Sequence, residues 1–207
     1  MPSGYDPEHE QALLLDLLPE KEGTYIDIGA GWHKGHSTTF PFFFKRAWSG
    51  ILVEPHPVRA GKLRAKRPHD ILVQAALSDR PGEAWLSLTE TEGHDTIHPA
   101  RAALLKKQGK VRGKERVPVK TLKQVLDQWP QKAAQCSFVS VDVEGHEMEV
   151  LAGAPLQDEK WHPRVWLIES NKISRPKLHA FMKQFRYVVR FENPVNTLFL
   201  YQPKSWH

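Results

Sequence analysis

The chain has 207 residues, of which 40% are hydrophobic and 26% charged, and its formal net charge is +5. These values are ordinary for a globular protein and exclude a fibrous or disordered chain, while the length favours a single domain over residues 1–207. No apolar run approaches the roughly 18 residues that a membrane span requires.

The cysteine content and the first residues favour a cytoplasmic protein. Cys136 is the single cysteine and stands just before an apolar stretch, so we expect it to be buried in the core and not to act as a reactive thiol. The apolar run at residues 13–18 is interrupted by Asp16 and is preceded by acidic residues, so we do not expect a signal peptide.

The first predicted element is a leading helix within residues 1–20. Asp6 and Pro7 suit the N-cap and the first helical position. The apolar residues that share one face at helical spacing are Leu13, Leu14, Leu17 and Leu18. We expect this helix to cover one edge of a sheet.

A glycine-rich turn follows the first predicted strand, within residues 25–37, which read YIDIGAGWHKGHS. Asp27 lies at the carboxyl end of the strand. The small residues of the turn are Gly29, Ala30, Gly31 and Gly35. Glycine permits backbone angles and a close ligand approach that a β-carbon would obstruct. The turn therefore predicts a nucleotide-cofactor site.

A second apolar run, at residues 51–53, ends in Glu54. If its strand is the parallel neighbour of the first, the Glu54 carboxylate lies beside the glycine turn and is able to bind two ribose hydroxyls. The same pattern also fits a loose dinucleotide loop, so an NAD-dependent oxidoreductase is an alternative.

Helices and strands alternate in the first half of the chain. A helix is predicted to begin near Thr39, because Pro41 suits a first turn, and Phe42, Phe43 and Phe44 are expected to pack beneath the sheet. A helix at residues 58–66 and a strand at residues 71–76 follow. Such alternation predicts a parallel sheet with right-handed crossovers.

A short strand is predicted at residues 84–88, and residues 89–118 have the least predictable structure. We expect a substrate lid or an insertion there. His94 and His98 flank Asp95 in this segment; we expect both to face solvent, with acceptor recognition as the alternative. Residues 101–123 include nine basic residues and one acidic residue. This pattern indicates a solvated helix and linker, or else a surface that binds an anionic substrate or nucleic acid.

The second half contains a helix at residues 119–129, a buried strand at residues 138–143 and a helix that begins near Glu147. Further strands are predicted at residues 165–168, 187–191 and 197–201, the last two joined by an Asn-Pro turn as an antiparallel hairpin. The residues that follow the buried strand and bear titratable groups are Asp142, Glu144 and His146. Ligands of open parallel sheets bind at such strand ends.

The segment at residues 139–153, VSVDVEGHEMEVLAG, resembles the Asp-x-Glu-Gly-x-Glu-x-x-x-Leu-x-Gly signature of the FkbM-type class I S-adenosylmethionine-dependent methyltransferases. Three further motifs match that family in the same order: DIGAG at residues 27–31, EPHP at 54–57 and AALSD at 75–79. The resemblance spans residues 24–202. It implies a Rossmann-like α/β fold, with a mostly parallel central sheet, an antiparallel C-terminal hairpin strand and helices on both faces.

The resemblance also implies S-adenosyl-L-methionine as the cofactor. Its implied contacts are Asp27 with the ammonium, Gly29, Ala30 and Gly31 with the adenosine and methionine moieties, Glu54 with the ribose, Ala75 and Ala76 with the adenine, and Asp142 with the transferred methyl group.

The resemblance suggests that the methyl acceptor is an oxygen of a sugar or of another polar small molecule. An anionic acceptor is an alternative. A hydroxyl acceptor needs a base, for which Asp142, Glu144 and His146 are the candidates, whereas an amine acceptor needs none. A basic nucleic-acid-binding protein with a regulatory or vestigial cofactor pocket is a second alternative. No metal is expected, although Asp142, His146 and Glu169 at neighbouring strand ends suit a divalent cation.

Overall fold

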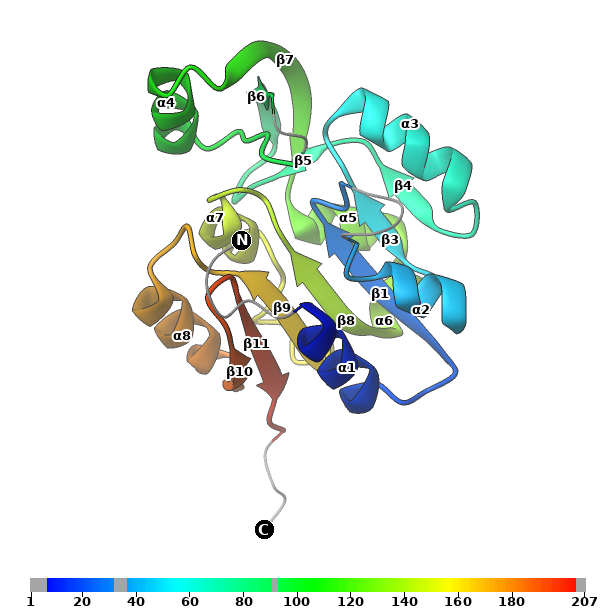
Figure 1. Ribbon diagram of the computed structural model, residues 1–207. Coiled ribbons are helices and arrows are strands. Elements are labelled where there is room, and N and C mark those ends of the chain that lie inside the picture. The colour runs from blue at the N-terminus through cyan, green and yellow to red at the C-terminus, as the bar shows by residue number, and fades with distance from the viewer. Residues whose placement is uncertain (1–6, 32–36, 91–92, 204–207) are drawn as a thin grey trace.

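The computed structural model describes residues 7–31, 37–90 and 93–203. It is an α/β structure in which helices cover both faces of a mixed central sheet (Figure 1). The sheet order is β10-β11-β9-β8-β1-β3-β4, with β2 also paired to β1. The expected fold class, a mostly parallel sheet with helices on both faces, is confirmed.

The strands of the central sheet have the following bounds: β1 Glu22–Ile28, β2 Ala47–Trp48, β3 Ile51–Val53, β4 Ile71–Val73, β8 Cys136–Val141, β9 Val165–Glu169, β10 Tyr187–Glu192 and β11 Asn196–Tyr201. The strands from β4 to β9 along the sheet are parallel to their neighbours. β11 is antiparallel to both β9 and β10, so the predicted C-terminal hairpin is confirmed.

One face of the sheet is covered by α1 (Pro7–Leu17), α2 (Phe40–Lys45) and α3 (Pro57–Lys66). Leu14 and Leu18 are fully buried in the same cluster as Tyr25 of β1, Phe138 of β8 and Leu198 of β11. The leading helix therefore lies over the middle of a face, and the prediction that it covers an edge was wrong. Its apolar side meets the apolar side chains of several strands at once, which an edge does not offer.

The aromatic triplet of α2 is divided between core and surface. The helix begins after Thr39, as predicted. Phe42 is fully buried, whereas Phe44 is 71% exposed, so the expectation that all three aromatic residues pack beneath the sheet was wrong. Residues two positions apart on a helix point to different sides, and a short helix buries only one of them.

The other face is covered by α5 (Leu122–Gln128), α6 (Pro130–Ala134), α7 (Glu147–Ala152) and α8 (Arg175–Gln184). The helix predicted at residues 119–129 begins later than expected. Thr121 and Gln124 form a reciprocal capping box at the start of α5, because the Thr121 hydroxyl accepts from the Gln124 N–H and the Gln124 side chain accepts from the Thr121 N–H. Val119 belongs instead to a strand.

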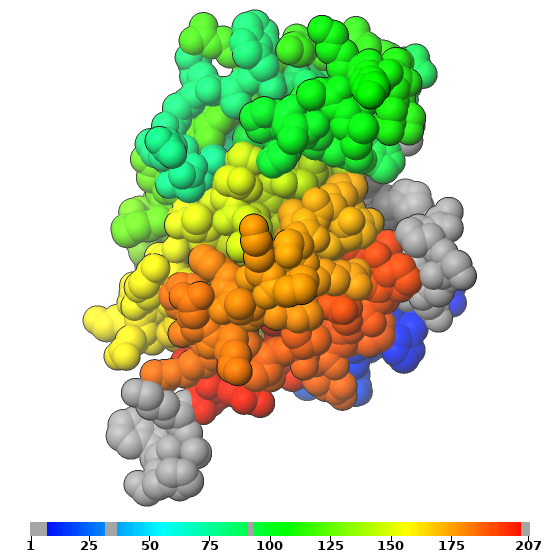
Figure 2. All heavy atoms as spheres, turned by 90° about the vertical axis from the view of Figure 1, so that its left-hand side faces the viewer, coloured from blue at the N-terminus to red at the C-terminus, as the bar shows by residue number. Residues whose placement is uncertain are grey.

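That strand is part of a small second sheet of order β5-β7-β6, formed by β5 (Ala76–Leu77), β6 (Gly82–Thr89) and β7 (Val111–Lys120). The single strand predicted at residues 71–76 is thus two strands in different sheets. α4 (Pro99–Lys107) lies between β6 and β7 in the chain. In the view of Figure 2 this green region lies directly above α7 and α8, drawn in yellow and orange.

Cys136 begins β8, is only 9% exposed, and burial raises the pKa of its thiol to about 12. The prediction that Cys136 is buried in the core is confirmed. In the part of the chain that the structure describes, no helix combines the length and the apolar character needed to cross a membrane.

Candidate functional site

A cavity of about 900 Å³ opens at the carboxyl ends of β1, β3, β8 and β9. This is within the range of small-molecule and cofactor sites. The predicted site residues that line it are Asp27, Gly29, Ala30, Gly31, Glu54, Ala75, Ala76, Asp142 and Glu144. The structure therefore brings together residues from all four sequence motifs. Gly35 lies outside the described residues.

Gly29 is required by a close approach of two strand ends. Its φ is +82°, and a β-carbon at this position would lie 1.8 Å from the Asp142 carbonyl oxygen. The Asp142 N–H donates to the Ile28 carbonyl at 2.9 Å, which holds the ends of β1 and β8 together. This glycine would be needed for the strand contact even without a ligand.

Glu54 lies beside the glycine turn, as the parallel pairing of β1 and β3 predicts. Its Oε2 accepts from the Gly31 N–H at 2.9 Å and its Oε1 from the His56 N–H at 2.7 Å. Arg59 approaches Oε1 at 3.2 Å. Glu54 is only 1% exposed, and these contacts hold its carboxylate in one orientation. The sequence did not predict Arg59 as a partner of Glu54.

Asp27 is buried at the end of β1. The Thr39 hydroxyl donates to its Oδ2 at 2.5 Å. Burial raises the pKa of Asp27 to about 6, although Thr39 and Arg67 oppose the rise. Arg67 is 1% exposed and donates to Thr39 at 3.1 Å and to the Tyr25 hydroxyl at 2.6 Å. A buried arginine network, absent from the sequence-based interpretation, therefore supports this corner of the site.

Asp142 and Glu144 follow β8 at the centre of the cavity. Asp142 is exposed and lines the cavity. Its pKa is raised well above the usual value, first because little water surrounds the carboxyl group and then because Glu169 and Glu144 lie beside it. Glu144 adopts a left-handed conformation, with φ of 59°, and its carbonyl accepts from the Thr96 hydroxyl at 3.0 Å. Such strained non-glycine residues are concentrated at functional sites.

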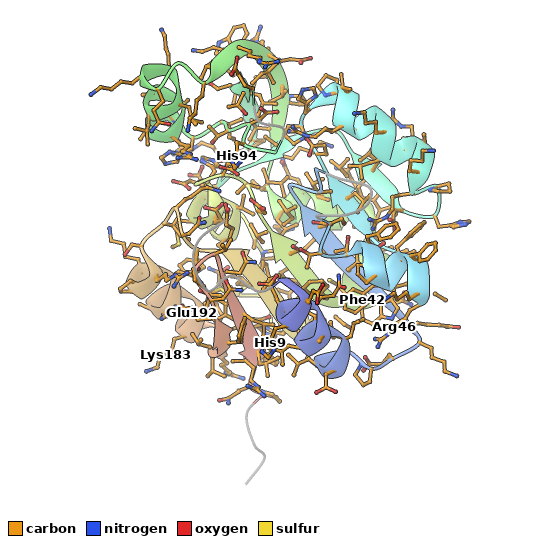
Figure 3. The ribbon with its side chains drawn as sticks, in the orientation of Figure 1. His9, Phe42, Arg46, His94, Lys183 and Glu192 are labelled. Atoms are coloured by element: carbon orange, nitrogen blue, oxygen red, sulfur yellow. The ribbon has the colours of Figure 1, made fainter. Side chains whose placement is uncertain are left out.

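Cationic groups gather on the Glu144 carboxylate. Lys172 Nζ lies 2.9 Å from its Oε2 and also contacts Glu169. Arg101 approaches the same Oε2 at 3.6 Å. His94 Nδ1 lies 3.0 Å from Oε1, and Figure 3 shows His94 between the small sheet and α7. His94 and Lys172 line the cavity. Sequence reasoning missed Lys172, whose only signal was its position just after β9.

His146 lies outside the lining of the cavity. It is the N-cap of α7; its Nε2 is 3.0 Å from the Ser78 hydroxyl, and its Nδ1 is 3.6 Å from Glu149. Burial lowers the pKa of this imidazole. The structure therefore does not join His146 with Asp142 and Glu169, and the cation site suggested from those three residues is not formed. Glu147 stands beside Asp142 and Glu169 instead.

Residues 93–97 form a wall of the cavity instead of an open loop. Asp95 accepts from the Thr89 N–H at 2.7 Å and pairs with Arg59 Nη1 at 2.7 Å. His98 caps α4 by accepting from the Arg101 N–H at 3.2 Å. The expectation of a solvent-facing side chain was therefore wrong for His98, whereas the His94 side chain lines the cavity and is still 45% exposed. Glu10 and Gln11 of α1 also line the cavity.

The basic run at positions 101–123 is distributed over α4, β7 and α5 and is partly neutralised. Arg112 pairs with Glu90 at 3.2 Å, Arg116 pairs with Glu83, and Lys123 pairs with Asp127 at 2.7 Å. Arg101 turns towards Glu144. The helix that was predicted within this basic run is α4. The segment that was predicted as a linker is instead the strand β7.

The mostly parallel sheet, with a cavity at the carboxyl ends of its strands, agrees with the class I methyltransferase fold that the sequence motifs imply. The family model of the methyltransferase FkbM domain matches residues 27–189, so the chain belongs to this family. It is a methyltransferase whose methyl donor is S-adenosyl-L-methionine. This assignment decides against the NAD-dependent oxidoreductase.

No curated protein sequence matches the chain. Two solved structures resemble it in shape. A TehB-like SAM-dependent methyltransferase from Corynebacterium glutamicum has a TM-score of 0.45 and 8% identity, with 93% of this chain and 87% of that chain covered. The 1,6-didemethyltoxoflavin-N1-methyltransferase of Burkholderia thailandensis, solved with 1,6-didemethyltoxoflavin and S-adenosylhomocysteine, has a TM-score of 0.46 and 12% identity, with 95% and 78% covered. Because both TM-scores are below 0.5, the family assignment depends on the sequence match.

Proposed function

We propose that the protein transfers a methyl group to a hydroxyl oxygen of a polar small molecule such as a sugar. The observation that carries this proposal is the pair formed by His94 and Glu144 at the cavity, with Nδ1 and Oε1 3.0 Å apart. An alcohol is a poor nucleophile until it loses its proton, so its methylation needs a base. An imidazole oriented by a carboxylate is such a base.

The residues present fit the methyl donor. The ribose hydroxyls would bind Glu54, whose carboxylate is already oriented beside the glycine turn. The ammonium of the donor would bind near Asp27, and the adenine near Ala75 and Ala76, which line the cavity. When bound, the donor supplies an electrophilic methyl group on a sulfonium. The task left to the protein is mainly alignment of the acceptor.

In the proposed reaction Glu144 accepts the Nδ1–H of His94, which leaves Nε2 free to take the hydroxyl proton of the acceptor. The acceptor oxygen forms the new bond to the methyl carbon. The bond between that carbon and sulfur breaks with its electron pair remaining on sulfur. Asp142 lies at the same strand end and would orient the acceptor. His94 replaces His146 among the candidate bases, because His94 lines the cavity.

The charges around the cavity favour a neutral acceptor. The acidic residues that line it, in addition to the donor-binding Asp27 and Glu54, are Glu10, Asp95, Asp142, Glu144 and Glu169. Its cationic residues, Lys172 and Arg59, are already paired with carboxylates. An anionic acceptor would meet a net negative wall, whereas the hydroxyls of a polyol would find acceptors for their hydrogen bonds. We therefore propose an uncharged polyhydroxylated molecule and not an anionic one.

The base is tested with the substitution His94→Gln. We expect kcat to fall by about 10²- to 10⁴-fold, the range for loss of a general base, with the affinity for S-adenosylmethionine unchanged. His69→Gln is the matched control, because His69 is exposed and does not line the cavity. Equal kcat values for His94→Gln and the wild type would remove the base from the proposal.

The acceptor is identified by incubating the protein with a metabolite extract and an isotopically labelled methyl donor, followed by mass spectrometry. We expect label on the oxygen of a neutral hydroxylated compound. Label on an amine or on a nucleic acid would overturn the proposed reaction, while calorimetry with S-adenosylmethionine and with NAD checks the donor separately.

A further inference from the structure

Three carboxylates meet at the floor of the cavity. They are Asp142 after β8, Glu147 at the start of α7 and Glu169 at the end of β9, and one oxygen from each lies within 4.8 Å of the others. Glu147 is fully buried and Glu169 is 6% exposed. Asp142 is open towards the cavity. Asp142 and Glu169 line the cavity, whereas Glu147 is not part of its lining.

Two oxygens of this carboxylate trio are buried without a hydrogen-bond partner among the described residues. They are Glu147 Oε2 and Glu169 Oε2. Glu147 Oε1, in contrast, accepts from the Val143 N–H at 3.2 Å and the Gly145 N–H at 3.1 Å. Burial of an unpaired carboxylate oxygen is costly unless a proton or a cation compensates it. The two unpaired atoms therefore indicate that a proton or a cation is held at the carboxylate trio.

The cationic side chains nearby leave the carboxylate trio largely unneutralised. Arg101 and His94 both turn to Glu144, and Lys172 divides its ammonium group between Glu144 and Glu169 Oε1. In the described part of the chain Asp142 and Glu147 form no ion pair with a basic side chain. When all three carboxylates are ionised, one shared ammonium group leaves them with a net negative charge, which attracts an added cation.

We propose that Asp142, Glu147 and Glu169 bind a divalent cation. Oxygen ligands alone, without imidazole or thiolate, suit a hard ion such as Mg²⁺ or Mn²⁺. The open side at Asp142 leaves coordination positions for water or for an oxygen of the acceptor. If the proposed O-methylation is right, the ion lowers the pKa of the acceptor hydroxyl and thus assists its loss of a proton to His94. Binding of the ion itself does not depend on that reaction.

The test is a titration of MnCl₂ into chelator-treated protein without donor or acceptor, followed by the decrease of the free Mn²⁺ electron paramagnetic resonance signal. We expect saturable binding of one ion, weakened at least tenfold by Glu147→Gln and by Glu169→Gln. The glutamine at position 147 still offers an oxygen to the Val143 and Gly145 N–H groups, and thermal unfolding checks that each variant is folded. If Glu147→Gln does not fold, Glu169→Gln alone decides.

Glu149→Gln is the control, because Glu149 lies on the same helix but belongs to a different group with His98 and His146. We expect its Mn²⁺ affinity to equal that of the wild type. Absence of saturable binding, or weakening by Glu149→Gln in place of the other two variants, would overturn the site. Binding of S-adenosylmethionine in the presence of chelator is measured in parallel, so a failure of the cation site and a failure of the donor assignment are distinguishable.

Discussion

At the scale of single residues, Gly29 links the fold to the site. The contact between the ends of β1 and β8 brings Asp27 and Asp142 to the same cavity, and it leaves no room for a β-carbon at position 29. We expect Gly29→Ala to lower the free energy of unfolding by at least about 3 kcal/mol, because the added methyl group meets backbone and the φ is positive. Urea denaturation at a pH near 7 measures the change.

Gly82→Ala is the matched control for this prediction. Gly82 is exposed on β6, and a β-carbon there meets no atom within 4 Å. We expect its stability to stay within about 0.5 kcal/mol of the wild type, as for most surface substitutions. If the two alanine variants were equally stable, the close approach at Gly29 would not be a constraint on the fold.

At the scale of elements, the central sheet was predictable and the small sheet was not. β3 is a continuous apolar run and β8 is largely apolar, because the helices bury both faces of the sheet. In β7 the residues at positions 112, 114 and 116 are exposed and basic, so the strand resembles a charged linker in sequence. Its inward positions include Gly113 and Glu115, which conceal the period of two.

The same limit applies to the candidate site. Its motif residues were predictable, because each follows an apolar strand whose neighbours in the sheet are predictable. Arg59 and Lys172 were not, and acceptor recognition by His94 was only an alternative, because these residues reach the cavity through ion pairs that bridge separate elements. No local pattern records such pairs.

The ion pair between Asp95 and Arg59 joins the wall formed by residues 93–97 to α3. We expect Asp95→Ala to raise amide hydrogen exchange at residues 93–98 by at least about tenfold, since the segment then opens independently of the core, while exchange in β1 and β8 stays unchanged. Exchange followed by mass spectrometry measures both. Glu83→Ala, which breaks the exposed pair with Arg116 on the same small sheet, should leave residues 93–98 unaffected. Faster exchange throughout the chain would instead make Asp95 a determinant of global stability.

At the scale of the whole molecule, Asp27 couples the stability of the fold to pH. Its pKa is raised from 3.8 to about 6, chiefly by burial, while Thr39 and Arg67 oppose the rise and Asp70 and Glu54 add to it. A carboxyl group whose pKa is raised in the folded state favours folding while it is protonated. That contribution is complete below pH 4 and is lost as the pH rises through about 6.

We therefore expect Asp27→Asn to remove part of the decrease in unfolding free energy between pH 4 and 6. Above that range we expect the variant to be more stable than the wild type by up to roughly 3 kcal/mol, since one pKa unit corresponds to about 1.4 kcal/mol. The asparagine oxygen still accepts from Thr39, so the local hydrogen bond is kept. Urea denaturation at several pH values, without donor, measures the difference. Added S-adenosylmethionine should reverse the order of stability at pH 7, because its ammonium stabilises the charged Asp27 and not the amide of the variant. An equal gain in unfolding free energy for both proteins would place the ammonium elsewhere in the cavity.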